Sequence, residues 1–271
     1  MQHGQYYPGL ERLKRLPVIR NLWQRERLNH FLSDGGGGLH YGRFNSFDEA
    51  RAWLPKSSSH DLEILSDEYM EIRSKRVYAF DYPVMFWLRN AFDAGARSIF
   101  DIGGSVGVHY YSYRRYMTFP SDLVWRVSEL PVVCRLGREY AQRQGVTAVQ
   151  FNESLDTSNI SDDIWIAAGV LEFLENSRLE DLLARAAKRP QHILINKLAL
   201  WKGEEYVSTQ NIGAGSFTAH YVFNRERFIA AVQAQGYELV DSWDVPERCY
   251  QDPREPERDF ANYSGLCFRR T

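Results

Sequence analysis

A short apolar run that leads directly into a glycine-rich turn constrains this chain more than any other feature. The run is Ser98–Ile102, and the turn covers residues 103–107. Glycine is required where the backbone must turn tightly or approach a ligand with no Cβ in the way. A strand that enters such a turn and leaves it as a helix is how α/β proteins bind nucleotides. The segment therefore predicts an α/β domain with a nucleotide or nucleoside site.

The spacing of the glycines indicates which classes of nucleotide ligand the turn can bind. The dinucleotide fingerprint G-x-G-x-x-G starting at Gly103 would need glycine at positions 105 and 108, where Ser105 and Val108 stand. The phosphate loop of nucleoside triphosphatases needs a lysine after its last glycine, and no lysine follows Gly107. The remaining pattern, Asp-x-Gly-x-x-x-Gly, suits a ligand without phosphates and disfavours an NAD-dependent oxidoreductase.

Composition excludes several classes of protein. A chain of 271 residues suits one large α/β domain with a smaller piece in front. With 25% charged residues and a net charge of −2, it lacks the excess of positive charge that is typical of nucleic-acid-binding proteins. Cys134, Cys249 and Cys267 are too few and too scattered for a disulfide framework or a zinc site. The N-terminus lacks a signal-peptide core, and no apolar run is long enough to span a bilayer. We expect a cytoplasmic protein without stable membrane insertion.

Two regions are predicted. Over residues 1–90, leucines at near-helical spacing with basic residues between them predict a helical N-terminal cap on the substrate side, with a basic membrane- or partner-binding helix as the alternative. Over residues 91–271, strands and helices alternate, which predicts βαβ units and a parallel sheet. The predicted strands are 98–102, 123–128, 148–151, 164–168, 192–198, 237–243 and 263–269, and the clearest helices are 132–144, 179–188 and 225–235.

The glycine turn resembles the first motif of class I S-adenosylmethionine (SAM) methyltransferases. The order of elements also resembles their Rossmann-like seven-stranded sheet, whose last strand inserts antiparallel. The resemblance implies SAM as the cofactor and assigns the turn to its methionine part, through Asp101, Gly103, Gly104, Ser105 and Gly107. Asp101 would hold the amino group directly or through water. A tight strand–helix turn without a ligand is the alternative.

The end of the second strand supplies the ribose contact. Glu129 follows this strand, where a carboxylate can accept both ribose hydroxyls. Together with Leu130 and Pro131 it resembles the acid-Leu-Pro segment of many small-molecule O-methyltransferases. A Glu129 that serves only the positive end of the following helix is the alternative.

Two further strand ends complete the predicted cofactor site. After the third strand, Asn152 or Glu153 would meet the adenine amino group. After the fourth strand, residues 167–174 resemble the fourth motif of the superfamily, where the small residues Ala168 and Gly169 would let the sulfonium end approach the backbone.

Methyl transfer to oxygen benefits from a general base. Some O-methyltransferases place a histidine beside the fourth motif, where this chain has Glu172. His109 follows the glycine turn, and His220 with Tyr221 lies in a polar segment, 208–224, predicted to be a loop that closes as a lid. A purely structural histidine is the alternative in both places. The chain lacks the carboxylate set of the metal-dependent catechol type, so no metal is expected.

Several further sequence segments resemble a narrower family within the superfamily. Residues 208–213, His220-Tyr221, Asn224-Arg225, 236–243 and 263–265 resemble a family of methyltransferases often encoded among bacterial surface-polysaccharide genes. The resemblance implies transfer of a methyl group to an oxygen of a small polar or glycosyl acceptor. Where that family has a Pro-Tyr step, this chain has His220-Tyr221. Methylation of nitrogen or another heteroatom, and a non-catalytic binding protein of the same fold, stay open, as does a homodimer.

Overall fold

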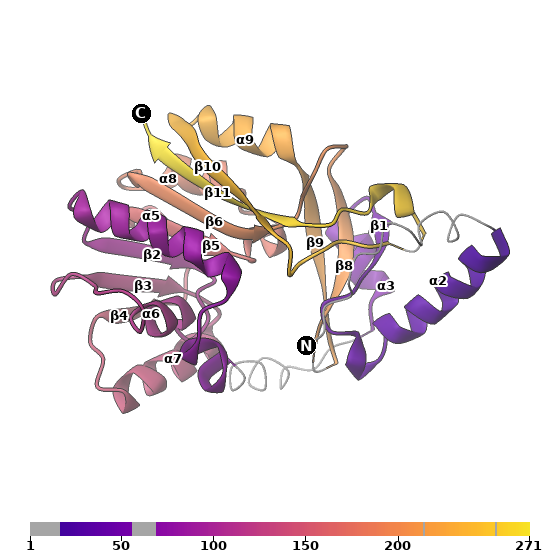
Figure 1. Ribbon diagram of the computed structural model, residues 1–271, viewed down its shortest axis with the longest axis horizontal. Helices are drawn as coiled ribbons and strands as arrows, with labels where there is room; N and C mark the ends of the chain where they lie inside the picture. The colour runs from indigo at the N-terminus through magenta and orange to yellow at the C-terminus, as the bar shows by residue number, and fades with distance from the viewer. Residues whose placement is uncertain (1–16, 56–68, 214, 253) are drawn as a thin grey trace.

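The computed structural model describes residues 17–55, 69–213, 215–252 and 254–271. In that part of the chain, a seven-stranded sheet with helices on both faces lies next to a four-stranded sheet (Figure 1). None of the described helices is long and apolar enough to cross a bilayer.

The large sheet has the strand order β10-β11-β6-β5-β2-β3-β4. Its strands are β2 (Ser98–Ile102), β3 (Val124–Ser128), β4 (Val149–Asn152), β5 (Ile164–Ala168), β6 (His192–Leu198), β10 (Tyr237–Val245) and β11 (Tyr263–Arg270). The strands from β4 to β6 pair in parallel, and β11 runs antiparallel to both of its neighbours. This arrangement confirms the predicted Rossmann-like sheet of the class I methyltransferase fold.

Helices cover both faces of the central part of this sheet, and its central strand β5 is accordingly a continuous, fully buried apolar run. The helices are α5 (Tyr82–Asp93), α6 (Val108–Tyr113), α7 (Pro131–Arg143), α8 (Leu179–Arg185) and α9 (Arg225–Gln233). Because successive strand residues point to opposite faces, Phe100 packs in one cluster with Leu182 of α8 and Val232 of α9. Its neighbour Ile99 packs on the other face with Leu88 of α5.

The smaller sheet has the order β1-β8-β9-β7. Its strands are β1 (His40–Phe44), β7 (Leu200–Trp201), β8 (Tyr206–Gly213) and β9 (Ser216–Asn224), and α2 (Pro17–Phe31) and α3 (Phe47–Trp53) lie beside it (Figure 1). Short 3₁₀ turns cover Asp34–Gly36, Arg73–Lys75, Ala79–Asp81, Leu171–Phe173 and Pro256–Arg258.

The predicted loop over 208–224 is wrong, because these residues form the β8–β9 hairpin, with His220 and Tyr221 inside β9. The polar residues of β8 are buried by contacts with distant backbone groups. The Ser208 hydroxyl donates to the carbonyl of Gly42 at 2.7 Å, and the Asn211 amide donates to that of Phe31, also at 2.7 Å. Strand β1, the partner of β8, also lies within the region 1–90 for which the sequence predicts a helical cap. The leucines before Pro17 lie outside the described residues.

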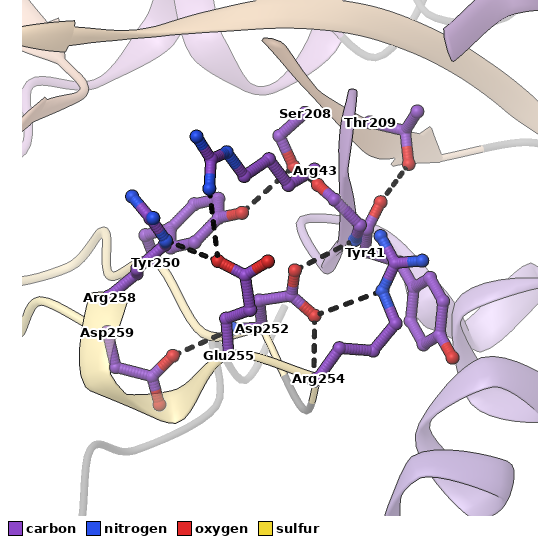
Figure 2. Close-up of polar contacts among 11 residues, drawn as sticks. Tyr41, Arg43, Ser208, Thr209, Tyr250, Asp252, Arg254, Glu255, Arg258 and Asp259 are labelled. Atoms are coloured by element: carbon purple, nitrogen blue, oxygen red, sulfur yellow. Dashed lines mark hydrogen bonds and ion pairs between the residues drawn. The ribbon is translucent and has the colours of Figure 1, made fainter. Parts of the chain in front are cut away.

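A loop with many charged residues, between β10 and β11 of the large sheet, contacts β1 through hydrogen bonds and ion pairs. We call residues 250–252 and 254–259 the anchor loop (Figure 2). The buried carboxylate of Asp252 accepts a hydrogen bond from the backbone N–H of Gly42 at 3.1 Å and one from that of Arg254 at 2.9 Å. Glu255 forms ion pairs with Arg43 of β1 and with Arg258. Each of these charges therefore has a partner of opposite sign or a backbone donor.

Candidate active site

A cavity of about 270 Å³ opens at the carboxyl ends of the central strands. The chain passes from β2 to β3 and β4 on one side and then to β5 and β6 on the other, so β2 and β5 form the switch point where open α/β sheets bind ligands. The cavity wall combines these strand ends with residues 69–81, Ile212 and Arg248. It consists of Tyr69, Arg73, Arg76, Tyr78, Phe80, Asp81, Gly103, Gly104, Ser105, Val108, His109, Ser112, Glu129, Leu130, Val133, Ala168, Gly169, Val170, Phe173, Lys197, Ile212 and Arg248.

The glycine turn is packed too closely for side chains. A Cβ on Gly103, where φ is +64°, would lie 2.4 Å from the side chain of Val170. A Cβ on Gly104 would lie 2.5 Å from the carboxylate of Asp101 beneath the turn. Both positions need glycine, and the turn therefore presents bare backbone to the cavity.

Asp101 lies beneath the turn and is fully buried, away from the cavity wall. Its carboxylate accepts hydrogen bonds from Nε1 of Trp125 and from Nδ1 of His109, both at 3.0 Å. An ionised carboxylate only accepts, so we assign the proton of His109 to Nδ1, which leaves Nε2 as the acceptor. His109 itself lines the cavity. Asp101 thus orients a histidine of the wall.

Glu129 faces the glycine turn from the end of β3. Its Oε1 accepts a hydrogen bond from the backbone N–H of Ser105 at 3.1 Å, and its Oε2 accepts one from that of Leu130 at 2.9 Å. Burial raises the pKa of Glu129, and the two backbone donors counteract that effect in part. Two amides therefore hold a single acidic group in a defined position at this end of the cavity.

Backbone strain is concentrated at the cavity. Among the described residues, two non-glycine residues have positive φ: Ser105 at 54° and Lys197 at 57°, and both line the cavity. Such conformations cost free energy and cluster at functional sites. Lys197 carries a second cost. Burial, together with the charges of Arg248 and Arg73, lowers its pKa to about 8 although Asp81 raises it.

His220 lies outside the cavity wall, in a buried hydrogen-bonded chain. The chain runs from the hydroxyl of Tyr263 to Nε2 of His40, from Nδ1 of His40 to Nε2 of His220, and from Nδ1 of His220 to the carbonyl of Tyr221, each at 3.0 Å. One assignment of protons satisfies all three bonds, with each donor pointing along the chain and both rings neutral. Burial lowers the pKa of His220 to about 4 and that of His40 well below its usual value.

The structure brings eight of the predicted site residues to one cavity and leaves the others apart. The eight are Gly103, Gly104, Ser105, His109, Glu129, Leu130, Ala168 and Gly169. Those outside the wall are Asp101, Gly107, Asn152, Glu153, Glu172, His220 and Tyr221. Glu153 forms an ion pair with Arg138, with 2.7 Å between their charged atoms. Gly107 caps α6 with φ of +89°.

Glu172 is buried behind the wall. Burial raises its pKa to about 7, and its Oε2 has no hydrogen-bond partner among the described residues. The hydroxyl of Tyr221 donates to the carbonyl of Glu175 at 3.3 Å, which places that side chain near the 3₁₀ turn Leu171–Phe173.

Sequence reasoning missed the cationic part of the wall. Lys197 follows the strand-end rule, since it lies near the end of β6, and that rule could have found it. No local pattern marks Arg73, Arg76 or Arg248, which reach the cavity from segments far from the glycine turn in the sequence.

Comparisons with known proteins give similarity of fold only. No family model matches the sequence, and no curated protein matches it. The structure is similar to 1,6-didemethyltoxoflavin-N1-methyltransferase of Burkholderia thailandensis with S-adenosylhomocysteine (SAH) bound (18% identity, 80% of this chain and 92% of that chain, TM-score 0.49). It is also similar to magnesium protoporphyrin IX methyltransferase of Synechocystis PCC 6803 with SAH bound (11% identity, 94% and 99% of the two chains, TM-score 0.48). At these identities and scores the likeness carries no functional argument, and function rests on the residues of the cavity.

Proposed function

We propose that this protein is a SAM-dependent methyltransferase that transfers a methyl group to an oxygen of a small polar or glycosyl acceptor. The observation that carries the proposal is Glu129, fixed by the amides of Ser105 and Leu130 across from a bare glycine turn that has no phosphate-binding lysine. A carboxylate in that position suits the two hydroxyls of a ribose, and the turn suits a ligand without phosphates.

The cavity residues fit this cofactor. Gly103 and Gly104 line the cavity without side chains, so the methionine part can approach their backbone. Ala168 ends β5 and Gly169 follows it, next to the turn, where small side chains leave room for the sulfonium. Bound SAM supplies an electrophilic methyl group, and the protein has mainly to orient two reactants and exclude water.

Oxygen acceptors need a proton acceptor, and His109 is the candidate base within the wall. Asp101 holds its Nδ1–H, so Nε2 is the nitrogen that can take a proton from an acceptor hydroxyl. The other three candidates, Glu172, His220 and Tyr221, lie outside the wall. A nitrogen acceptor, which can react without a base, is the second candidate function if His109 proves dispensable.

Calorimetry with SAM, SAH and NAD tests the cofactor. We expect micromolar binding of SAM and SAH and none of NAD. Glu129→Ala should weaken SAH binding by about 1–3 kcal/mol, because the ribose hydroxyls lose a charged acceptor. Glu139→Ala, which removes an exposed acid of α7, is the matched control and should bind like the wild type. Absence of SAH binding to the wild type would refute the proposal. Mass spectrometry of candidate acceptor pools incubated with methyl-labelled SAM then identifies the acceptor.

A further inference from the structure

Four cationic side chains line the cavity: Arg73, Arg76, Lys197 and Arg248. Within the described part of the chain, no carboxylate forms an ion pair with any of them. Three of them lie against aromatic rings instead. The guanidinium carbons of Arg73 and Arg76 are 4.8 and 4.5 Å from the ring centre of Tyr78, and Nζ of Lys197 is 5.4 Å from that of Phe80.

Several partly buried arginines elsewhere in the described chain have acidic partners, whereas Arg189 and Arg225 donate to the uncharged groups of Gln235 and Ser264. Arg126 pairs with Asp162, Arg178 with Glu205, and Arg258 with Glu255. The distinguishing feature of the cavity is therefore that four cations without ion pairs among the described residues line the same wall. A cluster of like charges without counter-ions costs free energy in the free protein, and an anionic ligand removes that cost.

The acids of the cavity form no ion pair with these cations within the described residues, although the charge of Asp81 acts on Lys197. Asp81 accepts hydrogen bonds from the backbone N–H of Tyr78 and the hydroxyl of Tyr113, and it lies beyond ion-pair distance of Lys197. Glu129 lies at the β3 end of the cavity. Glu172 is buried behind the wall, and burial raises its pKa to about 7, so near neutral pH it carries only part of a charge.

Two of the four cations lie on the opposite side of the sheet from Glu129. Lys197 lies near the end of β6 and Arg248 follows β10, whereas Glu129 follows β3 on the other side of the switch point. If Glu129 marks the ribose, then Lys197 and Arg248 are at the opposite end of the cavity, where the methyl acceptor has to bind.

The proposed cofactor cannot balance this charge by itself. SAM brings one carboxylate, and with it an ammonium and a sulfonium, so its binding increases the positive charge in the cavity. One guanidinium suffices for its carboxylate, which leaves Lys197 and Arg248 for another anion.

We propose that the methyl acceptor is a small acidic molecule whose carboxylate or phosphate group binds to Lys197 and Arg248. This inference rests on the proposed function and adds the class of substrate to it. Arginine offers planar, bidentate donors to either group, and lysine adds a point charge. The backbone strain at Lys197, which places its side chain in the cavity wall, then serves the recognition of the acceptor.

The test measures anion binding to the protein loaded with SAH. Melting temperature is recorded against inorganic phosphate and, separately, against malonate, with ionic strength held constant by sodium chloride. We expect a saturable rise with at least one of the two anions, and the tighter anion shows whether the acceptor carries phosphate or carboxylate. Lys197→Met and Arg248→Gln should each raise the apparent Kd at least tenfold. Lys202→Met, which removes an exposed lysine outside the cavity, should not change it.

Three results would overturn the inference. They are the absence of saturation with both anions, an equal response of the cavity variants and the control, and a loss of SAH affinity in both cavity variants, which would assign these cations to the cofactor's carboxylate. SAH binding to the wild type is measured first, and the same titration is repeated without SAH. Failure of the proposed cofactor is therefore distinguished from failure of the anion site.

Discussion

The anchor loop and the cavity differ in whether their charged side chains have partners. Around Asp252 and Glu255, each charge has a partner of opposite sign or a backbone donor (Figure 2). In the cavity, Lys197 and Arg248 have no acidic partner within the described residues, and Lys197 also carries backbone strain. The paired charges of the anchor loop hold β1 against the large sheet. The cations of the cavity can still bind an anion, and their lack of partners lowers the stability of the free protein. A separate difference distinguishes two histidines: His109 lines the cavity with its Nδ1 held by Asp101, whereas both ring nitrogens of His220 are bonded within the buried chain.

The largest expected effect separates those histidines by activity. His109→Gln should lower kcat by about 100-fold or more, because general-base catalysis typically contributes 10²–10⁴-fold. His220→Gln is the matched control, and its kcat should stay within about threefold of the wild type. Initial rates of label transfer from methyl-labelled SAM to the identified acceptor measure both. The opposite ranking would move the base to the small sheet, and full activity in His109→Gln would favour a nitrogen acceptor.

Removing a charge from the paired region should destabilise the fold. Asp252→Ala leaves the backbone N–H of Gly42 and the side chain of Arg254 without their carboxylate, which should cost about 3 kcal/mol in the free energy of unfolding. Urea unfolding followed by circular dichroism measures it. Arg76→Ala, which removes an exposed cation with no acidic partner in the described chain, should change stability by less than about 0.5 kcal/mol. Equal losses in the two variants would abolish the contrast.

Acid should introduce unpaired charge into the region beside the small sheet. Burial lowers the pKa of His220 to about 4, whereas an unfolded chain has a histidine pKa of about 6.5. Between these values the unfolded state binds a proton that the folded state does not. The free energy of unfolding should therefore fall with falling pH by about 1.4 kcal/mol per unit, and level off near pH 4.

His40 acts in the same direction as His220, whereas Glu172, whose pKa burial raises to about 7, acts in the opposite direction between about pH 4.5 and 7. The difference between wild type and His220→Gln removes the Glu172 contribution and reports that of His220 together with its coupling to His40. Denaturant unfolding at pH 7, 6 and 5 measures it. A difference that does not change with pH would show that His220 is accessible to protons in the folded state.

The sequence predicts the large sheet well because its signals are local. The run Ser98–Ile102, the glycine turn and the acid Glu129 each occur within a few residues, and the parallel sheet brings their ends together. The small sheet depends on long-range contacts. Ser208 and Asn211 are polar residues typical of a loop, and they are buried only because backbone carbonyls from β1 and α2 accept their hydrogen bonds. No periodicity within residues 208–224 contains that information, and the same is true of Arg248 in the cavity.

The smallest expected effect tests whether a cation without an ion pair in the cavity destabilises the free protein, in contrast to the paired charges of the anchor loop. Lys197→Met should stabilise the free protein, because burial lowers the pKa of Lys197 to about 8 against about 10.4 in an unfolded chain. With partial solvent access to the side chain, we expect a gain of about 1–2 kcal/mol at pH 7. In the wild type, the unfolded state binds the extra proton between about pH 8 and 10, so stability should rise with pH over that interval, and the variant should lose this rise. Urea unfolding at pH 7 and 9.5 measures both. A variant less stable than the wild type at pH 7 would mean that Lys197 has a structural partner and that charge in the cavity is balanced as it is in the anchor loop.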